Sequence, residues 1–247
     1  RERVRAALRE LDISIYGRIA VNLAPADLPK EGSLLDLPIA VALACEKKYC
    51  SPPGAAVYMG ELALDGRVRS VRGAVPAAML ARSLELPLFC PEGNAAEVAL
   101  VDGVEAYSVP TLKDLLLYLR REKELNRVVK NMPPSGLNAV EPDFADVKGQ
   151  LTARRALEIA AAGHHNILLV GSPGSGKTLM ARALQGILPP LSDDEFLETL
   201  LIRSSVGLPV PVDRRRPFRQ VHHTASTVSI CGGGSDIRPG EVSLAHR

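Results

Sequence analysis

The stretch that decides the fold is "HNILLVGSPGSGKTLMARALQGILPP", residues 165–190. Within it, "GSPGSGKT" (171–178) matches the phosphate-loop pattern G-x-x-x-x-G-K-[ST]. The apolar run Ile167–Val170 predicts a buried strand before this loop, and the residues after the loop predict a helix. A strand, a glycine-rich loop and a helix in this order are the context that the motif requires. The sequence therefore predicts an α/β nucleotide-binding unit.

The residue types in this loop suit a nucleoside triphosphate with Mg²⁺. Its glycines let successive backbone N–H groups point inward, and these donors form an anion cradle together with the N-terminus of the following helix. Lys177 adds a positive charge for the β- and γ-phosphates, and the Thr178 hydroxyl can bind Mg²⁺. The alternative is a glycine-rich turn that only resembles the motif, and the flanking elements disfavour it. The candidate cofactor-binding residues are Gly171, Ser172, Pro173, Gly174, Ser175, Gly176, Lys177 and Thr178.

Hydrolysis also needs an acid after a second buried strand, to hold Mg²⁺ and to polarise water. The run "DDEFLE" (193–198) does not supply it, because Ser192 and Glu195 have the spacing of a capping box and predict the start of a helix. We find no other candidate acid before Arg247. The residues alone leave two alternatives: a nucleotide binder that does not hydrolyse, or an acid that lies beyond Arg247.

The composition indicates an ordinary globular protein. The chain has 247 residues, of which 46% are hydrophobic and 23% charged, so one large domain or two smaller ones can form a core. A net charge of +2 is too small to indicate a polyanion partner by itself. The cysteines Cys45, Cys50, Cys90 and Cys231 form no CxxC pair and are expected to be reduced thiols. Without a long apolar run or a signal peptide, we expect a soluble, cytoplasmic protein with no membrane partner.

The region before the phosphate loop predicts a separate α+β domain over residues 1–122. Asp36 and Thr111 are expected to be helix N-caps. Predicted helices span 1–11, 36–48, 74–85, 95–103 and 111–125; predicted strands span 14–25, 87–91 and 105–110, with a hairpin over 55–71 that turns at Asp65-Gly66. The proline-containing residues 123–145 predict a linker, and residues 146–247 a second domain.

Four segments resemble the ComM/YifB family of bacterial magnesium-chelatase-like AAA+ ATPases. They are "VNLAPADLPKEGSLLDLPIA" (21–40), "GQLTARRALEIAAAGHHNILLVGSPGSGKT" (149–178), "RPFRQVHHTAS" (216–226) and "GGGSDIRPGEVSLAH" (232–246). The chain departs from the family pattern at "RQVHH", where "RAPHH" is expected, and at Cys231. Neither departure touches the phosphate loop.

The resemblance implies an AAA+ αβα core that uses ATP and Mg²⁺ within a homo-hexameric ring. It further implies movement along DNA and branch migration when incoming DNA is integrated during natural transformation. In the family, "SLAH" is followed by the strand that carries the catalytic Asp-Glu pair. We therefore expect these acids after Arg247, no catalytic residue within this chain, and no hydrolysis by this part alone.

The resemblance also implies that the first domain is similar to the proteolytic domain of Lon. The stretch "LPKEGSLLDLPIA" (28–40) places a lysine, a glycine and a serine before an apolar helix, as a serine–lysine hydrolase would. Aligned on the Lon pattern, however, the nucleophile position falls on Leu34 and the lysine position on Val75. Ser33 with Lys30 or Lys47 is the remaining alternative for a dyad. We predict an inactive scaffold that can contact a protein partner.

An arginine cluster and two histidine pairs leave alternatives open. The arginines form either a solvated face or, at a ring's pore, contacts to the DNA backbone without sequence specificity. His164-His165 lie near the adenine in the AAA+ pattern, or simply end a helix. His222-His223 lack further ligands for zinc. The candidate DNA-contacting residues are Arg214, Arg215, Arg216, Arg219 and Arg238.

Three other functions stay open at this point. A chelatase-type motor would remodel a protein partner and not DNA, and the shared AAA+ motifs do not separate it from a DNA motor. An ATP-dependent protease is disfavoured by Leu34 and Val75. A passive nucleotide-binding module is the third alternative.

Overall fold

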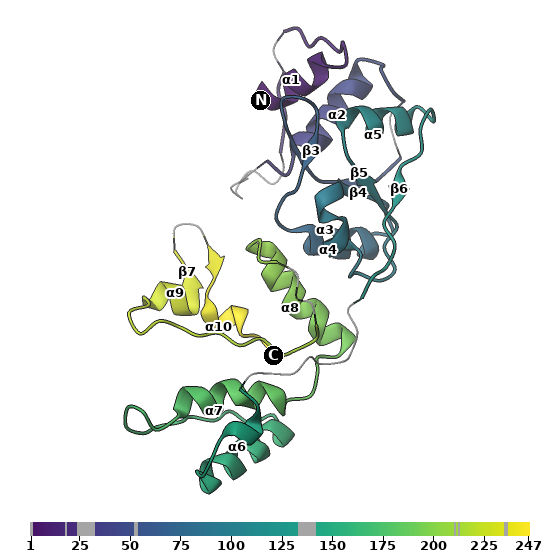
Figure 1. Ribbon diagram of the computed structural model, residues 1–247. Helices are drawn as coiled ribbons and strands as arrows, with labels where there is room; N and C mark the ends of the chain where they lie inside the picture. Colours follow the sequence, from purple (N-terminus) through teal and green to yellow (C-terminus); the bar gives the residue numbers. More distant parts are fainter. Residues whose placement is uncertain are drawn as a thin grey trace. The chain divides into compact units, whose positions relative to one another are not determined.

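The computed structural model in Figure 1 describes residues 2–17, 19–23, 33–51, 54–132, 142–209, 211, 213–234 and 237–247. The chain divides into two compact units, each described here by itself. The first unit comprises Arg1–Met132 with Arg203–Val210, and the second comprises Pro133–Ile202 with Pro211–Arg247.

The first unit combines five α-helices with six short strands in the part of the chain that the structure describes. Its helices are α1 (Glu2–Arg9), α2 (Asp36–Glu46), α3 (Ala74–Ser83), α4 (Ala95–Val98) and α5 (Leu112–Leu119). Its strands are β1 (Val57–Tyr58), β2 (Glu61–Leu62), β3 (Val68–Arg69), β4 (Leu88–Pro91), β5 (Ala106–Val109) and β6 (Asn126–Arg127). Most of the elements expected in this region are therefore confirmed, with shorter bounds.

A mixed sheet of order β1-β4-β5-β6 forms the centre of the first unit. Strands β1, β4 and β5 are parallel, and β6 pairs antiparallel with β5. All four residues of β4 are buried, as expected for a strand covered on both faces. The pairing of β6 also places Asn126–Arg127 inside this unit, although the sequence analysis assigned 123–145 to a linker. Residues 133–141 of that stretch lie outside the described residues.

Helices cover this sheet with two groups of apolar side chains. Helices α1, α2 and α5 lie together, and α3 and α4 lie together away from them (Figure 1). Leu8, Leu37, Leu112 and Leu116 of the first group are completely buried in one core. Each such leucine stabilises the fold by about 1.5–3 kcal/mol relative to an exposed one. The antiparallel hairpin β2–β3 turns at Asp65-Gly66 as predicted.

Asp36 has a different role from the predicted N-cap. The N-cap of α2 is Leu35, and Asp36 is the first helical residue. Its buried carboxylate accepts a hydrogen bond from Arg3 Nε at 2.7 Å and another from the Leu62 amide at 3.3 Å. The N-cap prediction was wrong because this carboxylate faces α1 and β2 and not its own helix. The cap predicted at Thr111 is confirmed, since its hydroxyl accepts from the amide of Asp114 at 3.1 Å.

Two predicted strands are absent from the described residues. Residues 14–17 and 19–23 have no strand partner, and Tyr16 and Val21 are exposed. Ile167–Val170 is likewise outside any strand. An alternating pattern indicates which side chains can share a face, but a strand also needs a hydrogen-bonded neighbour. No such neighbour is present here among the residues described.

The second unit is mainly helical in its described part. Its elements are η2 (Phe144–Asp146), α6 (Leu151–Gly163), α7 (Lys177–Ala183), η3 (Leu184–Gly186), α8 (Asp193–Ser205), α9 (Thr227–Cys231), β7 (Gly232–Gly233), β8 (Arg238–Pro239) and α10 (Glu241–Leu244). The last residues of α8 belong to the first unit. Strands β7 and β8 form a small antiparallel hairpin. Across the described ranges of both units, none of the helices has the length and apolar character to span a bilayer.

The position of Asp36 predicts a stability effect. Asp36→Ala leaves the Leu62 amide without its acceptor in a buried position, so we expect the free energy of unfolding to fall by about 1–3 kcal/mol in urea denaturation. Asp36→Asn keeps an acceptor oxygen and is expected to lose less. Asp65→Ala removes an exposed carboxylate from a surface pair with Arg67 and serves as the control, with a much smaller effect. Equal losses for Asp36→Ala and Asp65→Ala would contradict the role given to Asp36.

Candidate nucleotide-binding site

One small core of the second unit positions the phosphate loop. Phe144, Leu157 and Met180 form its centre, and Ile167 and Leu169 pack against it from the segment before the loop. Because side chains alternate along an extended chain, the intervening Leu168 and Val170 point away, and each is 85% exposed. The same core thus holds the chain on both sides of the loop, since Met180 lies in α7.

Two glycines give the loop its turn. Gly174 and Gly176 have φ values of 80° and 83°, in the left-handed region that favours glycine. Gly176 is also the N-cap of α7, so the loop runs directly into the helix. A Cβ added at Gly171 would lie only 3.1 Å from Ser175 Oγ, so the loop is closely folded there as well. This backbone fits a phosphate group, which needs N–H groups that converge on one point.

Lys177 places its charge at the loop itself. Its ammonium donates to the carbonyl oxygens of Gly171 and Ser172, at 2.9 and 2.7 Å, and to Ser175 Oγ at 3.2 Å. Lys177 and Thr178 open the first turn of α7, where backbone N–H groups have no partner within the helix. The structure therefore places residues 171–176 in the loop and Lys177 and Thr178 in the first turn of α7, so that an ammonium, a hydroxyl and helical amides lie next to the loop.

His164 ends α6 and also lines a cavity. Its φ of 52° is left-handed, and as the C-cap of α6 it donates its amide to the carbonyl of Ala160. Both observations fit the prediction of a residue that closes a helix. The cavity has a volume of about 300 Å³ and includes Phe144 and Ile187, which also belong to the core beside the phosphate loop. Proximity of this segment to an adenine stays a prediction.

The pair His222-His223 shows no metal geometry. The two rings lie tilted against each other with centroids 4.3 Å apart, and His222 Nδ1 is 2.7 Å from the Thr224 hydroxyl. Among the residues with described positions, no cluster of three or more His, Cys, Asp or Glu side chains could hold a metal ion.

Ion pairs within the second unit hold the candidate DNA-contacting arginines of the segment 214–219. The pairs are Arg214 with Asp193, Arg215 with Asp213, Arg216 with Glu195, and Arg219 with Glu241. Only 9% of the Arg216 side chain is exposed. Arg238 is exposed at β8. This geometry favours a structural role for the four paired arginines, and their contact with DNA stays a prediction.

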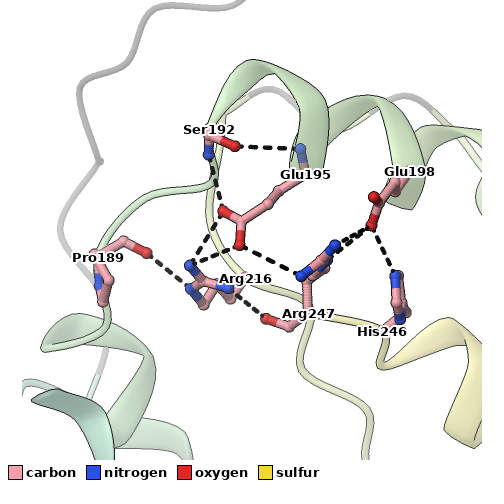
Figure 2. A network of polar contacts seen from close by, with 7 residues as sticks. All are labelled: Pro189, Ser192, Glu195, Glu198, Arg216, His246 and Arg247. Carbon is pink, nitrogen blue, oxygen red and sulfur yellow. Dashed lines mark hydrogen bonds and ion pairs between the residues drawn. The ribbon is translucent and has the colours of Figure 1, made fainter. Parts of the chain in front are cut away.

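Arg216 is the centre of the network in Figure 2. Its guanidinium donates to the carbonyl oxygens of Pro189 and Arg247, each at 3.0 Å, and to the Glu195 carboxylate at 3.3 Å. Glu195 also accepts from the Ser192 amide at 3.1 Å, and Ser192 Oγ accepts from the Glu195 amide at 3.3 Å. The capping box predicted from these two residues is therefore confirmed.

The carboxylates of α8 are stabilised in their charged forms. The pKa of Glu195 is lowered from its ordinary value of 4.5, first by the hydrogen bond from the Ser192 amide and then by the charge of Arg216. One helical turn on, the pKa of Glu198 is lowered by hydrogen bonds from His246 and Arg247. The sequence analysis missed Glu198, although its spacing of three from Glu195 puts both acids on one helix face.

The geometry separates Ser33 from Lys47 in the first unit. The Ser33 hydroxyl donates to the Glu61 carboxylate. Lys47 is the C-cap of α2, whose 11 residues place it about 16 Å beyond the end near Ser33. Lys30 lies outside the described residues. Val75, at the position of the Lon lysine, is completely buried and can accept no proton.

Two family models match this chain. "Magnesium chelatase, subunit ChlI" matches residues 143–247, and "Subunit ChlI of Mg-chelatase" matches residues 1–94. The chain is 42% identical over 252 residues to "Uncharacterized protein YifB" of Salmonella typhimurium, with 100% of this chain and 49% of that protein covered. It is 41% identical over 254 residues to "Competence protein ComM" of Haemophilus influenzae, with 99% and 50% covered.

The chain belongs to the magnesium-chelatase-like family that includes YifB and ComM. It spans about half the length of the curated relatives that it matches. A match of 41% identity over 51 residues links this YifB/ComM-family chain to "Archaeal Lon protease" of Halobacterium salinarum, but it covers 21% of this chain and 7% of that protein. This match shows a likeness to a Lon protease over a short stretch only, and the Lon-like character of the first unit stays a prediction.

The lowered pKa of Glu195 predicts a pH dependence in this YifB/ComM-family chain. A carboxyl group whose pKa is lower in the folded state contributes stability above its unfolded pKa, and this contribution is lost as the pH falls through the folded pKa. We expect the melting temperature of the second unit to fall below about pH 4.5, and to fall less in Glu195→Gln. Glu158→Gln, in an exposed pair with Arg155, should keep the wild-type profile. Identical profiles for Glu195→Gln and wild type between pH 3 and pH 7 would contradict this.

Proposed function

We propose that this chain binds Mg·ATP through residues 171–178, as the nucleotide-binding part of an AAA+ ATPase. The observation that carries the proposal is the conformation of the loop, which turns at glycines and leads directly into the N-terminus of α7. The Lys177 ammonium contacts the carbonyl groups of this loop. Membership of the magnesium-chelatase-like family supports nucleotide use in general. ATP, when bound, supplies the phosphoanhydride bond whose hydrolysis drives motors of this kind.

Each residue of the loop has a distinct part in this proposal. The backbone amides of the loop and of the first turn of α7 bind the phosphates. Lys177 exchanges its contacts with the Gly171 and Ser172 carbonyls for the terminal phosphates, because an anion is the stronger partner for an ammonium. Thr178 offers its hydroxyl to Mg²⁺. Hydrolysis needs acids that the sequence analysis expects beyond Arg247.

For the complete protein we further propose a homo-hexameric DNA motor. The support is the relative whose printed name is "Competence protein ComM". In this proposal the ring moves on DNA, promotes branch migration during integration of incoming DNA, and contacts the DNA backbone through the second unit. The first unit serves as a scaffold that contacts a protein partner, because its dyad positions hold Leu34 and Val75.

A chelatase-type motor that remodels a protein is the second candidate. The observation in its favour is the pairing of Arg214, Arg215, Arg216 and Arg219 with carboxylates, because paired arginines have less charge to offer to phosphates. Stimulation of the ATPase activity of the complete protein by branched DNA would favour the DNA motor. Stimulation by a protein partner alone would favour the chelatase-type motor.

The ATP proposal predicts a loss of nucleotide affinity in Lys177→Ala. Removal of one charge-assisted contact should weaken binding of a fluorescent ATP analogue with Mg²⁺ by about 10- to 100-fold in the complete protein. Lys148→Ala removes a lysine of the same unit that contacts only the Ala145 carbonyl in the described structure, and it should bind normally. If Lys177→Ala and Lys148→Ala bind alike, the loop does not hold the phosphates.

The DNA proposal predicts a change in salt dependence. If Arg238 contacts one phosphate, Arg238→Ala should lower the slope of log K against log salt concentration by about one. Arg155→Ala, at an exposed pair on α6, is the matched control and should keep the wild-type slope. An unchanged slope in Arg238→Ala would remove this residue from the DNA contacts.

A further inference from the structure

We infer that Cys45 and Cys50 form a redox-active dithiol, a modification site that closes to an intramolecular disulfide by exchange with a low-molecular-weight disulfide. Their Sγ atoms lie 3.1 Å apart. The pair belongs to the first unit and the phosphate loop to the second, so the inference does not depend on the proposed function.

The end of α2 brings the two thiols together. The helix ends at Glu46, and Lys48 follows in the left-handed region with φ of 58°. The Tyr49 amide donates to the Ala44 carbonyl at 3.0 Å, and the Lys48 amide donates to the Cys45 carbonyl at 2.9 Å. This pair of bonds is a Schellman motif, which reverses the chain after a helix. The reversal places Cys50 back over Cys45, five residues earlier.

Neighbouring contacts hold this turn in place although Lys48 is not a glycine. A residue other than glycine is strained in the left-handed region, so surrounding contacts must offset the strain. The Tyr49 ring lies under the Arg120 guanidinium, at 5.1 Å from its centroid. Cys50 itself packs into the main core and is 5% exposed. The spacing of the two sulfurs is thus fixed from both sides.

The surroundings give the two thiols different tasks. Cys45 is half-buried and Cys50 is buried, and both line an open cavity of about 900 Å³. Burial and the hydrogen bond to Cys45 raise the pKa of the Cys50 thiol, which keeps it protonated. Cys45 is therefore the thiol that an external disulfide meets first. Lys48, Arg120 and Arg121 line the same cavity together with Glu46 and Glu122, and Arg120 is ion-paired with Glu122. The balance of one positive charge is compatible with an anionic disulfide such as oxidised glutathione, which is the probe used below.

The exchange balances without any further reactant. The Cys45 thiolate attacks one sulfur of the external disulfide, a mixed disulfide forms on Cys45, and one external thiolate leaves. Cys50 then gives its proton to solvent, and its sulfur attacks the Cys45 sulfur. The Cys45–Cys50 bond forms and the second external thiolate leaves. The two protein thiols lose two electrons and two protons, and the external disulfide gains them.

The remaining cysteines are internal controls for this chemistry. Cys231 is exposed and lies in the second unit, so it should form only a mixed disulfide. Cys90 is completely buried in β4 and should react only if the first unit unfolds. Any reaction of Cys90 would thus reveal unfolding and not exchange.

The test equilibrates the complete reduced protein with glutathione and oxidised glutathione, blocks free thiols, and digests with trypsin. Because trypsin cleaves after Lys47 and Lys48, a Cys45–Cys50 bond appears as a cross-link between two peptides, which mass spectrometry identifies directly. We expect this cross-link in the wild type, with Cys231 glutathionylated and Cys90 unmodified. In Cys50→Ser, Cys45 should carry glutathione at about tenfold or higher occupancy than in the wild type, because no second thiol displaces it.

Two results would overturn the inference. One is glutathionylation of Cys45 to the same level in the wild type and in Cys50→Ser, without a cross-link. The other is a wild type in which Cys45 and Cys50 both stay reduced while Cys231 reacts. Cys45→Ser is a second variant that retains Cys50, and it should show neither cross-link nor glutathione on Cys50. Substantial glutathionylation of Cys50 in Cys45→Ser would contradict the burial on which the order of attack rests.

Discussion

The packing of one short extended segment against two helices determines where the phosphate loop lies. Ile167 and Leu169 precede the loop and pack against the core formed by Phe144, Leu157 and Met180. Met180 follows the loop, and the loop between them turns through left-handed glycines. This constraint fixes both ends of the loop. The Lys177 ammonium then closes it through contacts with its own carbonyl groups. The candidate site is therefore formed mainly by backbone groups, and the Lys177 side chain adds a positive charge.

Features set by neighbouring residues could be predicted from the sequence, whereas features set by distant partners could not. The cap at Thr111 and the capping box at Ser192 depend on residues a few positions apart, and both are where they were expected. The glycine turn at residues 174–176 also leads into a helix, as the motif predicted. The apolar run Ile167–Val170 predicted a buried strand, but Leu168 and Val170 are exposed. Its strand was not confirmed, because pairing depends on a neighbour that no local pattern can reveal. The role of Asp36 could not be predicted for the same reason, because its carboxylate accepts hydrogen bonds from Arg3 and Leu62, which are distant in the sequence.

The charged residues show why residue counts alone say little about partners. The sequence shows five arginines close together, and a solvated face or a DNA-binding surface follows equally well from that spacing. The structure pairs Arg214, Arg215, Arg216 and Arg219 with four acids, of which two lie in α8, one lies in α10 and one lies within the cluster. The dithiol is a parallel case, because a spacing of five between two cysteines carries no signal until a left-handed residue at Lys48 reverses the chain.

The central claim is that the amides of the phosphate loop and the Lys177 ammonium hold a triphosphate. Hydrogen–deuterium exchange of the complete protein, with and without Mg²⁺ and a non-hydrolysable ATP analogue, tests it most directly, because it reports on these amides themselves. The account predicts strong protection confined largely to peptides that cover residues 171–180. Unchanged exchange in these peptides at saturating analogue, with protection elsewhere or nowhere, would contradict it.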